Sequence, residues 1–292
     1  MTEYQLMPRA LVECIHLPEP HPFYIPWEQH IEDIRNMTVR EDDIFLCAYP
    51  KAGTHWLWEV LYMLLAGKAE YESRAKEHLM IEFSTIDKIQ AEASPRVFNT
   101  HLPFSMLPVQ QIKDKGAKVL HVYRNPKDSA VSMWFHYKQL DNLKDMTLRQ
   151  LVHWFLTDGI VYGTWKDFLK QVQKFVQDNP DVQFLNMSFE ETKRNPVDSV
   201  RRMARFLGVD ASDKLCQDIA DACSFQNMRK VEETSSKSFP EGAAYPFDQK
   251  MYRKGEIGDW KNYITVADSE AIDKAVAEML RECDKFKIEF EP

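Results

Sequence analysis

The stretch at residues 43–67, DIFLCAYPKAGTHWLWEVLYMLLAG, decides the fold class that we predict for this chain. Its apolar run at 44–48 indicates a short buried strand, a compact turn with Lys51 and Gly53 follows, and the remainder has the apolar spacing of a helix that stops at Gly67. A strand, a Gly/Lys turn and a helix in this order are typical of phosphate binding, because backbone N–H groups and the positive end of the helix point at the anion. We therefore expect this turn to bind a phosphorylated ligand.

Composition narrows the class of protein. The 292 residues are 44% hydrophobic and 12% aromatic, which is enough for a large core. The net charge of −8 argues against nucleic acid or an anionic membrane as the main partner. The five cysteines are scattered without a CxxC pair, as in cytosolic proteins with reduced thiols. With no signal-peptide pattern and no long apolar run, we expect a cytoplasmic protein without a membrane span.

The order of the predicted elements indicates one domain. Residues 1–42 read as a Pro-rich, irregular extension with a short helix at 27–37, and 230–258 read as a long substrate or cofactor loop. Further strands are expected at 96–103, 117–124 and 182–187, and further helices at 126–137, 147–158, 161–176, 196–207, 212–223 and 267–283. Alternating strands and helices without a linker predict a single α/β domain over 1–292, with a mostly parallel sheet flanked by helices and ligands at the carboxyl ends of the strands.

The phosphate-binding turn departs from the loop of ordinary ATPases and GTPases. Its lysine precedes the glycine, whereas a Walker A loop reads GxxxxGK[ST], and no acidic strand end suggests a Mg²⁺ site. The alternative is a surface turn with a solvated lysine. The buried strand on one side and Trp56 on the other favour the functional interpretation.

Two further segments carry cations that could bind anions. In YRNPKDSAVS, Arg124 ends a strand and Ser132 lies two helical turns into the next helix, which suits a second phosphate. In MYRKGEIGDWKN, Arg253, Lys254 and Gly255 offer two cations and a free backbone. Taken alone, the first could equally be an arginine at the sheet edge, and the second a solvated basic turn.

A histidine supplies the candidate general base. His101 follows a predicted strand in NTHLP, where it could accept a proton from a substrate hydroxyl. A lone histidine is more often a packed or surface residue, and we interpret His121, which lies inside a strand, as structural.

Taken together, these segments closely resemble the cytosolic sulfotransferase family, which uses 3′-phosphoadenosine 5′-phosphosulfate (PAPS) and releases 3′-phosphoadenosine 5′-phosphate (PAP). The resemblance runs from the P-loop-like YPK-x-GT-x-W at Tyr49 to the RKG-xx-GDWK signature at Arg253, which covers nearly the whole chain. The segment KNYITVADSE, from Lys261 to Glu270, resembles the family's KxxxTVxxxE dimerisation segment and implies a homodimer.

The resemblance implies roles for individual residues. His101 would be the general base, and Lys51 would neutralise charge on the leaving phosphate. The donor would be bound by three groups of residues: Lys51, Ala52, Gly53, Thr54 and His55 at the phosphosulfate; Trp56, Phe189 and Phe225 at the adenine; and Arg124, Ser132, Ser224, Met228, Arg253, Lys254 and Gly255 at or near the 3′-phosphate. The acceptor, a small phenol, alcohol, sterol or amine, would be lined by Phe23, Tyr24, Phe83, Phe135, His136, Tyr162 and parts of the 232–250 loop. No metal would be needed.

Five positions differ from the usual family pattern. Serine is common where this chain has Ala52, lysine where it has Asn99, threonine where it has His55 and Cys223, and tyrosine where it has Phe189. Asn99 removes one cation from around the transferred group. These departures keep open a second hypothesis, a PAPS- or PAP-binding module with weakened chemistry. A third, a small-molecule phosphotransferase, is disfavoured by the order of lysine and glycine in the turn.

Overall fold

A parallel sheet of four strands forms the centre of the chain in a computed structural model, which describes residues 27–140, 143–157, 160, 162–234 and 251–291. The strand order is β2-β1-β3-β4, with β1 at Ile44–Ala48, β2 at Val97–Thr100, β3 at Lys118–Tyr123 and β4 at Phe184–Ser188. The predicted parallel α/β architecture is therefore confirmed. Because all four strands point the same way, their carboxyl ends meet at one edge of the sheet.

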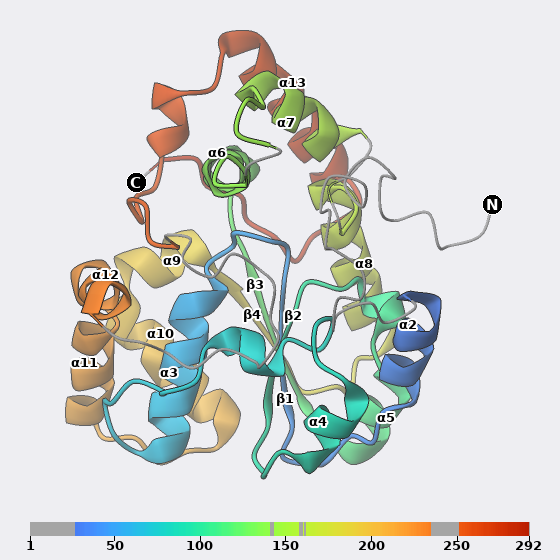
Figure 1. Cartoon of the computed structure of the whole chain (residues 1–292), viewed down its shortest axis with the longest axis vertical. Helices are drawn as coiled ribbons and strands as arrows, with labels where there is room; N and C mark the ends of the chain where they lie inside the picture. The colour runs from blue at the N-terminus through green and yellow to red at the C-terminus, as the bar shows by residue number, and fades with distance from the viewer. Residues whose placement is uncertain (1–26, 141–142, 158–159, 161, 235–250, 292) are drawn as a thin grey trace.

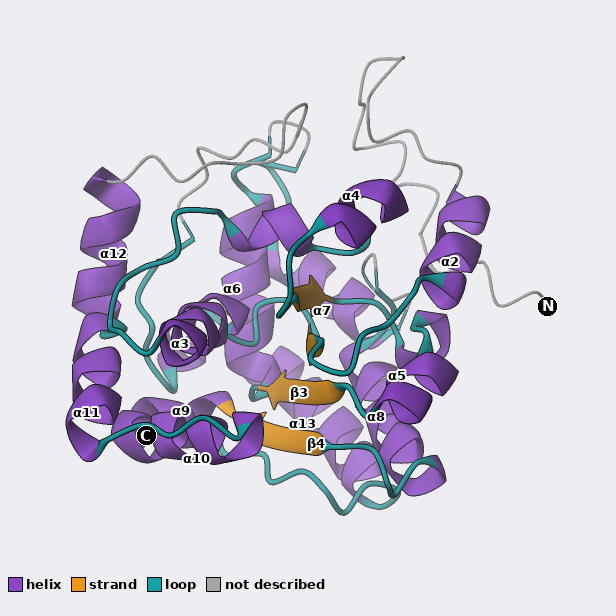
Figure 2. Cartoon of the chain, turned by 90° about the horizontal axis from the view of Figure 1, so that it is seen from below, coloured by secondary structure: helices purple, strands orange, loops and turns teal. Residues whose placement is uncertain are grey.

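Helices cover both faces of the sheet, as Figures 1 and 2 show. On one side lie α3 (Thr54–Ala66), α10 (Pro196–Leu207) and α11 (Asp213–Ala222), and on the other lie α2 (Trp27–Asn36), α5 (Val109–Lys115) and α8 (Trp165–Asp178). Beyond the carboxyl ends of the strands lie α6 (Pro126–Tyr137), α7 (Leu148–Leu156) and α13 (Val266–Leu280). The shorter elements are η1 (Lys76–Leu79), α4 (Ile86–Ala91), η2 (Phe104–Met106), α9 (Phe189–Arg194), α12 (Phe225–Thr234) and η3 (Asp259–Asn262).

The strand, turn and helix predicted at 43–67 are confirmed. Every residue of β1 is buried, and α3 begins directly after the turn. Gly67 ends α3 in the left-handed conformation with φ 66°, where its N–H bonds to carbonyls of the last turn. The helix that follows β3 is likewise confirmed: the Asn125 side chain accepts from the Asp128 N–H, and Pro126 occupies the first turn.

A buried ion pair closes the amino end of the sheet, opposite the site. Nε and Nη2 of Arg96 donate to the two Asp43 carboxylate oxygens at 2.7 and 2.5 Å, and both side chains are fully buried. Arg96 also donates to the carbonyls of Thr38 and Ile89. Because Asp43 precedes β1 and Arg96 precedes β2, this fork–fork pair fixes the two strands side by side.

Several predicted boundaries were wrong. The helix expected at 161–176 begins only at Trp165, because Thr164 is its N-cap, and it continues to Asp178. The helix expected to reach 283 ends at Leu280. The buried strand expected at 182–187 is β4, and its first three residues, 184–186, are only partly buried, since β4 is the last strand at one edge of the sheet.

The long polar segment expected at 230–258 is shorter than predicted. Residues up to Thr234 continue α12, whose apolar face is too sparse in sequence to signal a helix, and only Met228 is buried there. From Met251 the described chain returns to the sheet edge. The rest of the expected loop, 235–250, and most of the N-terminal extension, 1–26, lie outside the described residues.

Candidate functional site

The turn after β1 has an unusual backbone. Lys51 has φ 67°, the one positive value among non-glycine residues in the part of the chain that the structure describes, and Gly53 has φ 106°. A Cβ at Gly53 would lie 2.8 Å from the Phe189 ring, so only glycine lets the turn pack on that ring. Gly53 is also the N-cap of α3. Its carbonyl accepts the Trp56 N–H at 3.2 Å, and it has no side chain to bond the other N–H groups of the first turn. The turn therefore has the form of an anion-binding nest.

The Lys51 side chain extends from this turn toward Met251, in the segment that also carries Arg253 and Lys254. Its Nζ is 4.0 Å from the sulfur of Met251. Burial, together with the charges of Lys76 and Arg124, lowers the pKa of Lys51 from 10.5 to about 8. An anionic partner would stabilise the charged form of this lysine, because its negative charge offsets both the burial and the repulsion by the neighbouring cations.

His101 lies just beyond β2 and is nearly buried. Its Nδ1 is 2.7 Å from the carbonyl oxygen of Ala48, and its backbone N–H donates to Oε1 of Glu82 at 2.7 Å. A carbonyl can only accept, so Nδ1 carries the proton and the neutral ring keeps a lone pair on Nε2. Burial, followed by the charges of Lys76 and Lys51, lowers the pKa of His101 to about 3. The ring is therefore a free base at neutral pH.

Arg124 joins the turn to the segment MYRKGEIGDWKN, residues 251–262, which we call the basic segment. Its two Nη atoms donate to the carbonyls of Lys51 and Glu256, each at 3.3 Å, and its guanidinium stacks 4.1 Å from the Phe189 ring. Its Nε is buried without a partner among the described residues. Burial lowers the pKa of Arg124. A buried guanidinium held by two carbonyls, which carry no net charge, is suited to an anionic ligand.

The basic segment is held in place by two aspartates. Both lie inside the segments quoted from the sequence, YRNPKDSAVS and MYRKGEIGDWKN, but neither was predicted to have a role. Asp259 pairs with Arg253 at 2.6 Å and with Lys254 at 2.7 Å. The Asp128 carboxylate, at the start of α6, accepts the backbone N–H groups of Gly258 and Trp260 at 2.8 and 2.9 Å. These bonds bring the segment to the edge of the sheet, where Arg124 lies. No spacing rule in the sequence pairs residue 128 with residues 258 and 260.

Gly255 and Phe225 form a close contact beside this segment. Gly255 has φ 64°, and a Cβ there would lie 2.3 Å from the Phe225 ring. Met228, one turn further along α12, is buried. Among the other residues expected at the donor, Trp56, Ser132 and Ser224 are partly buried, and the buried Thr54 opens α3 beside the buried Ala52. His55 Nε2 lies 3.7 Å from Oε1 of Glu77.

The residues expected at the acceptor fall into three groups. Tyr162 packs edge-on against His101 at 5.4 Å, and His136 is close enough that the Lys51 and Lys76 charges add to burial in lowering its pKa. Phe83 is partly buried in the segment that supplies Glu82. Phe135 instead lies 4.6 Å from the Arg253 guanidinium, beside the basic segment. Phe23, Tyr24 and 235–250 lie outside the described residues.

Two charged residues near His101 were not singled out from the sequence. Glu82 is buried, and burial raises its pKa to about 7 even though it accepts bonds from the Thr100–His101 stretch. Lys76 is buried as well, and its charge acts on Lys51, His101 and His136. Both lie in a stretch of mixed composition that has no motif and is brought to the site only by tertiary packing.

Comparisons with known proteins identify the class. The sulfotransferase domain family matches residues 41–284. Sulfotransferase 1A1 of Mus musculus is 32% identical over 269 residues, which cover 87% of this chain and 90% of the mouse protein. Sulfotransferase 1E1 of Bos taurus is 30% identical over 266 residues, covering 86% and 88%. The crystal structure of mouse sulfotransferase SULT7A1 complexed with PAP is 32% identical, has a TM-score of 0.74 and covers 88% of this chain and 90% of that one.

This chain therefore belongs to the sulfotransferase family, as the motifs predicted, and it is a transferase. None of the helices in the described ranges is long and apolar enough to cross a membrane. The same ranges hold no group of three or more His, Cys, Asp or Glu side chains that could bind a metal ion.

Proposed function

We propose that this protein transfers the sulfonate group of PAPS to a hydroxyl or amine of a small hydrophobic acceptor. The observation that carries the proposal is the convergence of Lys51, Arg124 and the basic segment at the carboxyl edge of the sheet, with His101 beside them. The donor has anionic groups at both ends of a nucleoside, and this arrangement offers separated cations for them. Membership of the sulfotransferase family supports it.

The residues present fit this donor. Nε of Arg124 and Nη1 of Arg253 are buried without partners among the described residues, so each has a donor left for a phosphate oxygen. Gly53 and Gly255 keep the backbone open at the two places where side chains would collide with aromatic rings. We assign the phosphosulfate to Lys51 and the turn, the 3′-phosphate to Arg124, Ser132 and the basic segment, and the adenine to the space by Trp56 and Phe225.

The chemistry follows from the state of each group. PAPS, when bound, supplies the sulfonate and leaves as PAP. His101 accepts the proton of the acceptor at Nε2, which frees an oxygen or nitrogen lone pair to bond to sulfur as the bond from sulfur to the phosphate oxygen breaks. Lys51 and the α3 terminus stabilise the negative charge that develops on that leaving oxygen. The bond to Ala48 fixes the His101 tautomer throughout.

We assign the acceptor to the side of His101 that carries Tyr162, His136 and Phe83. Aromatic walls and a ring nitrogen suit a phenol, alcohol or sterol. Phe23 and Phe135 stay in the proposal as further lining residues.

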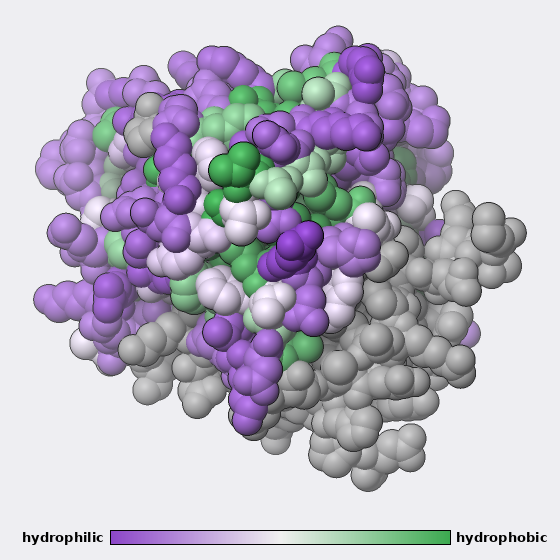
Figure 3. Space-filling view, turned by 90° about the horizontal axis from the view of Figure 1, so that it is seen from above, coloured by the Kyte–Doolittle hydropathy of each residue, from purple (hydrophilic) through white to green (hydrophobic). Residues whose placement is uncertain are grey.

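We also propose that the protein forms a homodimer through Lys261–Glu270 and is cytoplasmic. Figure 3 looks down on the face where α13 lies, and hydrophobic groups gather in its middle among hydrophilic ones. Val266, in the proposed dimer segment, is 75% exposed, which is high for a branched apolar side chain.

A donor-binding module with weakened chemistry is the second candidate, and the neutral residues Ala52 and Asn99 favour it. Incubation with sulfur-labelled PAPS and a panel of phenols, alcohols and amines separates the two. We expect labelled product with at least one acceptor. Tight PAPS binding without transfer to any acceptor would favour the module, and a requirement for ATP would favour a phosphotransferase.

A further inference from the structure

The segment that carries η1 runs along the carboxyl end of β2. Met80 bridges to Asn99 in parallel register, and the N–H of Ile81 donates to the Asn99 carbonyl at 3.2 Å. His101 follows two residues after Asn99, just beyond the end of β2, and its backbone N–H donates to Glu82 in the same segment that carries η1. The Asn99 amide is fully buried, and neither its Oδ1 nor its Nδ2 has a partner among the described residues.

Lys76, the first residue of η1, places its ammonium beside Glu77 and the start of α3. Its side chain is only 5% exposed, and Nζ lies 3.2 Å from Oε1 of Glu77. The same Glu77 oxygen lies 3.7 Å from Nε2 of His55, a residue of the phosphate-binding turn. The Lys76 charge also acts on Lys51 and His101. A buried ammonium beside the phosphate-binding turn can bind a ligand anion strongly, because little water competes for it there.

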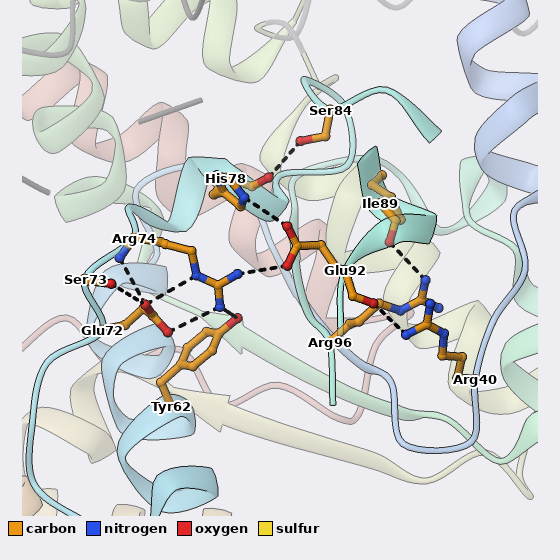
Figure 4. A network of polar contacts seen from close by, with 10 residues as sticks. All are labelled: Arg40, Tyr62, Glu72, Ser73, Arg74, His78, Ser84, Ile89, Glu92 and Arg96. Atoms are coloured by element: carbon orange, nitrogen blue, oxygen red, sulfur yellow. Dashed lines mark hydrogen bonds and ion pairs between the residues drawn. The ribbon is translucent and has the colours of Figure 1, made fainter. Parts of the chain in front are cut away.

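A partly buried network of ion pairs and hydrogen bonds holds the two flanks of η1 (Figure 4). The Glu92 carboxylate bonds to Arg74 at 2.9 Å and to His78 at 3.0 Å. These two residues lie two positions before and two positions after Lys76. Arg74 is also held by Glu72, which in turn accepts from the Arg74 backbone. With both flanks of η1 fixed, the position of Lys76 is fixed too, as a charge near a reacting group requires.

We propose that Lys76 binds the sulfonate oxygens of the donor and supplies the cation that strand β2, with asparagine at position 99, does not. This inference rests on the proposed function. The alternative role for Lys76 is a purely structural partner of Glu77. The two roles predict different effects on donor binding. If Lys76 binds the sulfonate, its removal weakens the binding of PAPS but not of PAP, whereas removal of a purely structural lysine affects both equally.

The test compares Lys76→Met and Lys76→Arg with Lys88→Met, which removes an exposed lysine of α4 in the same segment. Equilibrium binding of PAPS and of PAP is measured by calorimetry without acceptor, and kcat is measured with the best acceptor of the panel. For Lys76→Met we expect PAPS binding roughly tenfold weaker, PAP binding nearly unchanged, and kcat ~100-fold lower. Lys76→Arg should recover most of each loss, and Lys88→Met should match the parent protein.

Restoring a cation on β2 gives an independent check. In the double variant Lys76→Met/Asn99→Lys we expect part of the lost kcat to return. If the double variant does not fold, the recovery of PAPS binding and kcat in Lys76→Arg supports the proposal by itself. Equal weakening of PAPS and PAP with a lower melting temperature, or no effect in Lys76→Met, would overturn it. If the parent protein itself neither binds PAPS nor transfers sulfonate, the proposed function fails instead.

Discussion

Nδ1 of His101 lies 2.7 Å from the carbonyl oxygen of Ala48, the last residue of β1. This bond joins the candidate base to the strand that leads into the phosphate-binding turn. The same contact fixes the proton on Nδ1, leaves Nε2 free to accept one, and sets the distance between the base and the turn. One hydrogen bond therefore connects the residue that would accept the acceptor's proton to the strand that positions the proposed phosphosulfate site.

Replacing the base should stop transfer without preventing donor binding. For His101→Ala we expect kcat to fall ~100-fold or more, with the PAP dissociation constant within a factor of about three, because general-base catalysis contributes at this scale. Initial rates and calorimetry measure the two quantities. His153→Ala, at an exposed position of α7, is the matched control. A variant that retained turnover would remove His101 from this role.

The pH dependence of PAPS use should follow Lys51 on its basic side. Because the pKa of Lys51 is lowered to about 8, the ammonium is present below that pH and is lost above it. His101, with a pKa of about 3, is a free base over the whole neutral range. We expect kcat/KM for PAPS to fall above about pH 8. In Lys51→Arg the fall should move to higher pH. A profile that stayed flat to pH 10 would exclude Lys51 as the titrating group.

Adding a methyl group at Gly255 should damage donor binding specifically. The added Cβ would lie 2.3 Å from the Phe225 ring. The ring must therefore move, which disturbs the space beside it that we assign to the adenine. We expect Gly255→Ala to weaken PAP binding at least tenfold. Gly67→Ala is the control, since Gly67 has nearly the same φ, 66°, and open space around it. That variant should lose about 1 kcal/mol of stability and no affinity. Equal affinities for the two variants would be inconsistent with this site.

Removing the buried guanidinium should abolish recognition of the 3′-phosphate. For Arg124→Met we expect PAP to bind ~10- to 100-fold more weakly, the scale of a hydrogen bond to a charged group, while AMP, which lacks that phosphate, loses much less. Arg149→Met, at an exposed site on α7, should bind both as the parent does. Equal losses for PAP and AMP would move Arg124 away from the 3′-phosphate.

The sequence predicted the elements whose signals are local. The apolar run at 44–48, the Gly/Lys turn and the Asn125–Pro126 helix start each have a short-range cause, and each lies in the structure where it was expected. Helix ends were less predictable. Thr164 is the N-cap of α8, and its side chain accepts the backbone N–H of Asp167. Such local side-chain bonds set where a helix begins, and helix propensity alone does not predict them.

The parts of the site that escaped prediction depend on long-range contacts. Asp128 joins α6 to a segment about 130 residues further along, and Glu82 accepts the backbone N–H of His101. Glu92 bonds to Arg74 and His78, on either side of Lys76. Lys76, Glu82 and Glu92 belong to no periodic pattern or motif, and Asp128, although it lies in YRNPKDSAVS, has no local signal that points to residues 258 and 260. Their role depends on which surfaces the fold brings together, and a buried charge reveals itself only once burial is known.

The most direct test of the central claim is a single-turnover reaction. The parent protein, loaded with sulfur-labelled PAPS, is mixed with the pooled panel of phenols, alcohols and amines, and label in the organic product is counted over time. We predict that the label passes to an acceptor at neutral pH without ATP, and that His101→Ala holds the same amount of PAPS but passes the label ~100-fold or more slowly. Label that remained on PAPS in the parent protein with every acceptor, although the donor is bound, would contradict the account.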